Sequence, residues 1–134
     1  MNNNGPTHFR GLPLVVVVAE EDAIGRATLA ALLSCDGYRV FQAENLNAAI
    51  SCLHRINDIT VLFADLDMPG WKSLVGYAIN TSPDTFVIAM AENDAVPEIS
   101  DLRRYGIQAF LQKPLLYNDV RQALSATVEK PRAA

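Results

Sequence analysis

Short apolar runs alternate with segments of helical periodicity along most of this chain. The first run, Leu14–Ala19 (LVVVVA), contains four consecutive valines, which is typical of a strand covered on both faces. Similar runs follow at 38–43, 59–64, 85–91 and 107–112, and a segment with apolar residues at helical spacing comes after each run. Five successive β/α units predict a parallel sheet with helices on both faces and right-handed connections.

Residues that favour helix ends support this division. Asp22 and Asn45 stand where the first two helices begin and are good N-caps, while Gly37 is a good C-terminal signal. A short third helix is predicted at 73–80, and Gly76 weakens it. The fourth and fifth helices are predicted at 96–106 and 117–130.

Length and composition indicate one soluble domain. A chain of 134 residues supports a single core, and its net charge of −4 gives no electrostatic reason to bind nucleic acid or anionic lipid directly. Residues 1–12 are interpreted as a flexible arm, 13–129 as the domain and 130–134 as a tail. No run is long enough to span a membrane, and no signal peptide is recognised, so a cytoplasmic location is expected. Cys35 and Cys52 are interpreted as buried or half-buried helix thiols.

Charged residues follow the predicted strands at one edge of the sheet. Glu20 and Glu21 come after the first strand, Asp65 and Asp67 after the third, and Lys113 after the fifth. In open parallel sheets the ligand site lies beyond the carboxyl ends of the strands. Carboxylates gathered there repel one another, and Mg²⁺, which prefers oxygen ligands, would offset that repulsion. No glycine-rich loop follows the first strand, which argues against a bound nucleotide or flavin.

Three motifs together resemble the receiver domain of two-component response regulators, over about Leu14–Val128. They are "VVVVAEEDAIGRATLAALLSCDGYRV" at 15–40, "DLDMPG" at 65–70 and "FLQKP" at 110–114. The resemblance implies a flavodoxin-like, doubly wound five-stranded parallel sheet of order 2-1-3-4-5 with five helices. It also implies a signalling module of two-component systems rather than an enzyme.

The resemblance assigns the acidic residues to phosphoryl transfer. Asp65 would accept a phosphoryl group from a histidine kinase or phosphotransfer protein. Mg²⁺ would lie between Glu21, Asp65 and the backbone carbonyl of Asp67, with Glu20 reaching the metal through water. The family usually has Asp at the position of Glu21, so we expect weaker metal binding here, because glutamate is one methylene longer.

The resemblance also assigns residues near the fourth and fifth strands. Lys113 would bind the phosphoryl group, and the Lys113–Pro114 bond is expected to be cis. Ala91 stands at the phosphoryl-binding position where the family has Ser or Thr, and Phe110 stands at the position of the switch aromatic. Because Ala91 has no hydroxyl group, we expect a weak switch in which Phe110 is buried against Ala91 even without phosphorylation. A segment shorter than usual around Trp71 predicts a reshaped loop and a short third helix.

Three functions remain open from the sequence. The leading one is a stand-alone phosphorylated receiver that a downstream protein reads over Val96–Arg104, the fifth strand and the last helix. The second is a degenerate receiver that binds proteins independently of phosphorylation, which the residues at 21 and 91 favour. The third is a Mg²⁺-dependent phosphatase of the haloacid dehalogenase type, because Asp65 and Asp67 also match its D-x-D motif.

Overall fold

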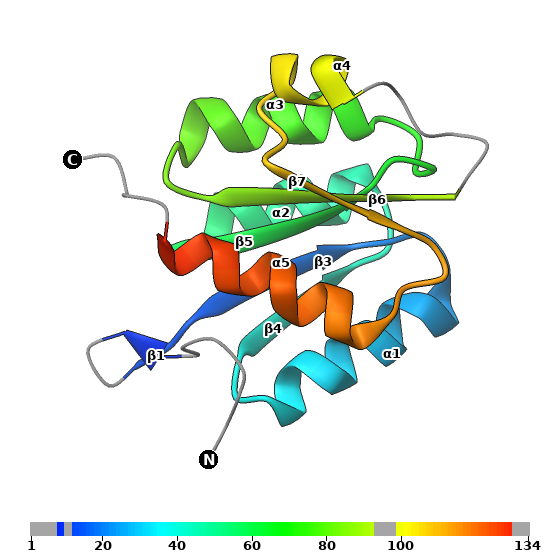
Figure 1. Cartoon of the computed structure of the whole chain (residues 1–134). Helices are drawn as coiled ribbons and strands as arrows, with labels where there is room; N and C mark the ends of the chain where they lie inside the picture. Colours follow the sequence, from blue (N-terminus) through cyan, green and yellow to red (C-terminus); the bar gives the residue numbers. More distant parts are fainter. Residues whose placement is uncertain (1–7, 10–11, 93–98, 130–134) are drawn as a thin grey trace.

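A five-stranded parallel sheet forms the centre of the molecule in the computed structural model, which describes residues 8–9, 12–92 and 99–129 (Figure 1). Its strands are β3 (Val15–Ala19), β4 (Arg39–Ala43), β5 (Ile59–Asp65), β6 (Phe86–Ala91) and β7 (Ala109–Gln112). They lie in the order β4-β3-β5-β6-β7, and all four pairs are parallel. Counted within this sheet the order is 2-1-3-4-5, which confirms the predicted fold class. β3 and β5 are therefore neighbours, and strand order reverses at their carboxyl ends.

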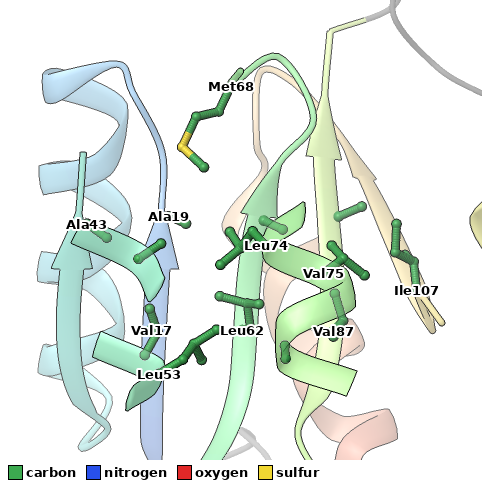
Figure 2. Close-up of a cluster of buried hydrophobic side chains, with 14 of the residues drawn as sticks. Val17, Ala19, Ala43, Leu53, Leu62, Met68, Leu74, Val75, Val87 and Ile107 are labelled. Atoms are coloured by element: carbon green, nitrogen blue, oxygen red, sulfur yellow. The ribbon is translucent and has the colours of Figure 1, made fainter. Parts of the chain in front are cut away.

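Helices cover both faces of the sheet. They are α1 (Ala23–Cys35), α2 (Leu46–Arg55), α3 (Trp71–Thr81), α4 (Ile99–Arg104) and α5 (Tyr117–Glu129). α1 and α5 pack on one face, where Leu33 and Val120 are fully buried. α2, α3 and α4 pack on the other, and Figure 2 shows side chains of α2 and α3 pointing toward those of β3, β5 and β6. Among the described residues, no helix is both long and apolar enough to cross a membrane.

Local signals fix the ends of the first two helices as the sequence predicts. The Asp22 carboxylate accepts a hydrogen bond from the Gly25 amide at 2.7 Å, and the Asn45 side chain accepts one from the Ala48 amide at 2.8 Å. Each bond satisfies an amide that has no partner within its helix. Gly37 follows α1 with φ of 103°, a conformation that other residues rarely adopt.

The third helix is longer than predicted. α3 has 11 residues and begins at Trp71, so the expectation of a short helix was wrong. Its N-cap is Gly70, which has φ of 85° and no side chain to make a capping bond, so the usual start signal is missing. Gly76 lies inside the helix, where burial of Leu74, Val75 and Ala78 outweighs a propensity cost of about 1 kcal/mol.

Two further predictions need correction. Within the expected N-terminal arm, β1 (His8–Phe9) pairs antiparallel with β2 (Leu12–Pro13), because pairing lets two short segments satisfy each other's backbone groups. Cys52 is buried on α2 as expected, but Cys35, the last residue of α1, is exposed. The predicted start of the fourth helix near Pro97 lies outside the described residues, and α4 is described from Ile99.

Candidate functional site

The site lies at the carboxyl edge of the sheet, where β3, β5 and β7 end. Ala19 of β3 is in register with Ala64 of β5, so the next residues along the two strands, Glu20 and Asp65, lie side by side. Lys113 follows β7, and its backbone amide donates to the Ala91 carbonyl at 2.8 Å, which holds this residue at the end of β6. The parallel topology alone thus places these charged groups together.

The ammonium group of Lys113 contacts three carboxylates. Its Nζ lies 2.9 Å from Asp65 Oδ1, 3.0 Å from Glu20 Oε2 and 3.4 Å from Asp67 Oδ2. Asp65 has no exposed surface and the Glu20 side chain is only 6% exposed, whereas the Asp67 side chain is 28% exposed. One positive charge faces three negative ones, so the site carries an excess of negative charge that a cation would neutralise.

This charge imbalance changes the protonation of the site. Burial, together with the nearby charge of Asp65, raises the pKa of Glu20 from 4.5 to about 7, although the Lys113 ammonium acts in the opposite direction. Burial alone would lower the pKa of Lys113, but its hydrogen bonds with Asp65 and Glu20 and their negative charges outweigh this effect and raise it. Lys113 is therefore a permanent cation at neutral pH.

The two carboxylate oxygens of Asp65 have different partners. Oδ1 accepts hydrogen bonds from Lys113 Nζ and, at 2.9 Å, from the Asp67 amide. Oδ2 accepts a longer hydrogen bond, of 3.5 Å, from the Glu21 amide. Oδ2 thus has the longer hydrogen bond and is the less stabilised oxygen, while the Lys113 ammonium stands at Oδ1.

The donors for a metal are only partly assembled as predicted. Glu20 and Asp65 lie together as expected, and the side chain of Asp67, expected to take part only through its backbone carbonyl, joins them at Lys113. The side chain of Glu21 is exposed, and this residue contacts Asp65 through its amide. Within the described ranges, no three His, Cys, Asp or Glu side chains group closely enough to hold a metal ion. Two adjacent buried carboxylates with excess negative charge are nevertheless oxygen donors of the kind that Mg²⁺ binds, so the donor chemistry fits this ion.

The predicted switch residues lie on β6 and β7. Ala91, the last residue of β6, is fully buried. Phe110 is half-buried and packs against the core cluster that contains Ala91, so it is less buried than we expected. The Lys113–Pro114 bond is cis, which confirms that prediction.

Sequence reasoning missed a pocket next to the site. It has a volume of about 340 Å³ and lies between α1 and α5, with Leu29 and Val120 among its apolar lining residues. Glu20 and Lys113 line it as well, so it adjoins the charged groups. Tyr117 also lines the pocket and donates to Asp36 Oδ2 at 2.5 Å, which ties α5 to the end of α1. No short-range sequence pattern signals this pocket, because its walls come from opposite ends of the chain.

A second missed feature lies on the opposite face, where α3 meets the end of α4. The rings of Trp71 and Tyr105 meet edge to face with centroids 5.2 Å apart. The Lys72 ammonium lies 5.6 Å from the Trp71 centroid and 5.4 Å from that of Tyr105. Such contacts are favourable, and they stabilise the packing of the end of α4 against the start of α3, the helix that follows the loop after β5.

Comparison with known proteins agrees with this geometry. The family model described as the response regulator receiver domain matches residues 16–125. A two-component response regulator from Oryza sativa subsp. japonica, ORR6, is 25% identical over 119 residues, covering 82% of this chain and 68% of that protein. The sensor histidine kinase AruS from Pseudomonas aeruginosa is 32% identical over 124 residues, covering 83% of this chain but only 12% of that much longer protein.

A solved structure shares the fold at low sequence identity. It is a response regulator protein from Burkholderia pseudomallei, described with a phosphorylated aspartic acid, a calcium ion and citrate. The two chains superpose with a TM-score of 0.74 at 21% identity, covering 87% of this chain and 69% of that one.

Proposed function

Because this chain belongs to the family of response regulator receiver domains, we propose that Asp65 accepts a phosphoryl group and that a partner protein reads the phosphorylated state. The donor would be a histidine kinase or a phosphotransfer protein. The observation that carries the proposal is the position of Asp65, which is the last residue of β5 and lies 2.9 Å from the Lys113 ammonium. A cation at this distance from the acceptor is suited to the negative charge of a transferring phosphoryl group.

The transfer follows from the groups around Asp65. A lone pair of Oδ2 attacks phosphorus, and the bond from phosphorus to the donor nitrogen breaks, with its electron pair remaining on the donor imidazole. Lys113 and the Glu21 amide donate to oxygens of the transferring group, whose charge is highest in the transition state. Mg²⁺ would be held by Asp65, the Asp67 carbonyl and Glu20, with Glu21 joining them once its exposed side chain turns toward the cluster, and the ion would neutralise phosphoryl oxygens.

Two surfaces would serve the partners. The pocket between α1 and α5 adjoins Lys113 and would receive the donor protein. A downstream protein would read the surface of residues 96–104, β7 and α5, of which 96–98 lie outside the described residues. Arg103 and Arg104 on α4 are exposed, and Tyr105 is 38% exposed, which provides charge and an aromatic anchor. Tyr105 packs on Trp71, so we extend this surface to the start of α3.

A degenerate receiver is the second candidate, and specific observations favour it. Asp65 has no exposed surface, the Glu21 side chain points into solvent rather than to the acid cluster, and residue 91 carries no hydroxyl. In this case the same surfaces would bind partners without a phosphoryl group.

Intact-mass spectrometry after incubation with acetyl phosphate and Mg²⁺ separates the two candidates. We expect the wild-type protein to gain one phosphoryl mass and Asp65→Asn to gain none. Asp84→Asn, which changes an exposed aspartate before β6, is the matched control and should be phosphorylated like the wild type. If neither acetyl phosphate nor a purified phosphotransfer protein adds mass to the wild type, the phosphorylated receiver is refuted and the degenerate one is favoured.

A further inference from the structure

The carboxylate of Asp67 connects three segments of the site. Its Oδ2 accepts hydrogen bonds from Lys113 Nζ at 3.4 Å and from the Glu92 amide at 3.2 Å. Its own amide donates to Asp65 Oδ1 at 2.9 Å. The loop after β5, the first residue after β6 and the first residue after β7 are thus joined through one side chain. We call its contacts with Lys113 and Glu92 the Asp67 bridge.

The bridge occupies donors that a phosphoryl group would use. A phosphoryl group on Asp65 brings three oxygens to this edge of the sheet, and these need cationic or N–H donors. Lys113 is the cation of the acid cluster, and Glu92 lies two residues beyond Met90, the β6 residue in register with Asp65. Without a phosphoryl group, the Asp67 carboxylate accepts hydrogen bonds from both the Lys113 ammonium and the Glu92 amide. Asp65 itself has no exposed surface.

Asp67 is the weakest held of the three carboxylates around Lys113. Its contact with Nζ is the longest, 3.4 Å compared with 2.9 Å for Asp65 and 3.0 Å for Glu20. Its side chain is 28% exposed, so water readily solvates the carboxylate once it is released. Ion pairs of this kind are worth little, and a phosphoryl group with a higher charge competes effectively for the same ammonium.

We propose that Asp67 is an internal anion that holds the site closed, and that phosphorylation of Asp65 displaces its carboxylate from Lys113 and Glu92. This inference rests on the proposed function. Displacement of Asp67 therefore releases the Glu92 amide at the end of β6 without a hydroxyl group at residue 91. Asp67 is a positioning residue, because it acts through Lys113 and Glu92.

Beryllofluoride, a phosphoryl mimic, tests the displacement step. Its affinity is measured by calorimetry at saturating Mg²⁺ for the wild type, Asp67→Ala and a control. We expect Asp67→Ala to bind it about three- to tenfold more tightly, since the competing carboxylate is gone. Asp22→Asn is the control: it removes a negative charge near the site yet retains a side chain able to cap α1, and its affinity should stay within about twofold of the wild type. Unchanged or weaker binding by Asp67→Ala would overturn the proposal.

Hydrogen exchange tests the bridge without any phosphoryl group or metal. The Glu92 amide should exchange faster in Asp67→Ala than in the wild type. In Asp67→Asn the amide oxygen still accepts the bond, so exchange should stay close to the wild-type rate. An unchanged Glu92 rate in Asp67→Ala overturns the bridge even where phosphorylation succeeds. If neither the wild type nor any variant binds beryllofluoride, the proposed function and the displacement step are both refuted. The exchange rate of the Glu92 amide then decides by itself whether the Asp67 bridge exists.

Discussion

Replacing Lys113 with methionine removes the positive charge of the acid cluster while it keeps a side chain of similar length. The three carboxylates that contact Nζ at 2.9, 3.0 and 3.4 Å are then left without a cation. Removing one partner of a buried ion pair costs about 3–5 kcal/mol. The Lys113 side chain is 18% exposed and that of Asp67 is 28% exposed, so solvent reduces this cost. We expect a loss of about 2–3 kcal/mol at pH 8 without metal.

The loss should depend on pH, because Glu20 relieves the repulsion by taking up a proton. Its pKa in the folded protein is about 7 when Lys113 is present, so it is mostly ionised at pH 8 and mostly protonated at pH 5.5. Lys113 acts to lower that pKa, so the variant holds the proton still more tightly. At pH 5.5 we therefore expect the loss to shrink to about 1 kcal/mol.

Urea unfolding in EDTA at pH 8 and pH 5.5 measures both values. At pH 8 the melting temperature of Lys113→Met should also be lower by roughly 8–12 °C. Lys72→Met is the control, because Lys72 is exposed and contacts the Trp71 and Tyr105 rings outside the acid cluster, so we expect a loss of at most about 1 kcal/mol that is equal at both pH values. A Lys113→Met variant as stable as the wild type at pH 8, or a loss that is equal at both pH values, would refute the electrostatic reasoning.

Two further predictions concern stability. The pKa of Glu20 is about 7 in the folded protein, higher than its ordinary value of 4.5. The stabilisation that protonated Glu20 adds to the free energy of unfolding is therefore fully present below pH 4.5 and is lost as pH rises through 7. In metal-free urea titrations, Glu20→Gln should abolish this part of the pH dependence, and an identical slope in both proteins would contradict the assignment. Gly106 has φ of 86°, and a Cβ there would lie 2.0 Å from Cδ1 of Ile79, so Gly106→Ala should cost about 2 kcal/mol in urea unfolding. Gly76→Ala is its counterpart, because nothing lies within 4 Å of the new methyl group inside α3, and it should stabilise the protein by about 0.5–1 kcal/mol; equal effects of the two alanines would refute the reasoning.

The sequence by itself determined the parallel sheet and which charged residues lie at its carboxyl edge. Mostly apolar runs separated by segments of helical periodicity allow few arrangements other than a parallel sheet, and strand order 2-1-3-4-5 followed from the family resemblance. Once β3 and β5 are neighbours, Glu20 and Asp65 must meet, since each stands at the end of its strand. Capping by Asp22 and Asn45 was also predictable, because each capping bond joins residues only three positions apart in the sequence.

Only the tertiary structure decided which groups bond to which within that edge. Lys113 reaches Glu20 across 93 residues of sequence and Asp65 across 48, and such partners depend on side-chain directions set by packing of the whole sheet. The same packing turns the Glu21 side chain into solvent, raises the pKa of Glu20, and places the Asp67 carboxylate against an amide 25 residues away. A strand pattern specifies which edge a residue occupies. Distances of a few tenths of an ångström, on which hydrogen bonding and charge balance depend, exist only after the elements have packed.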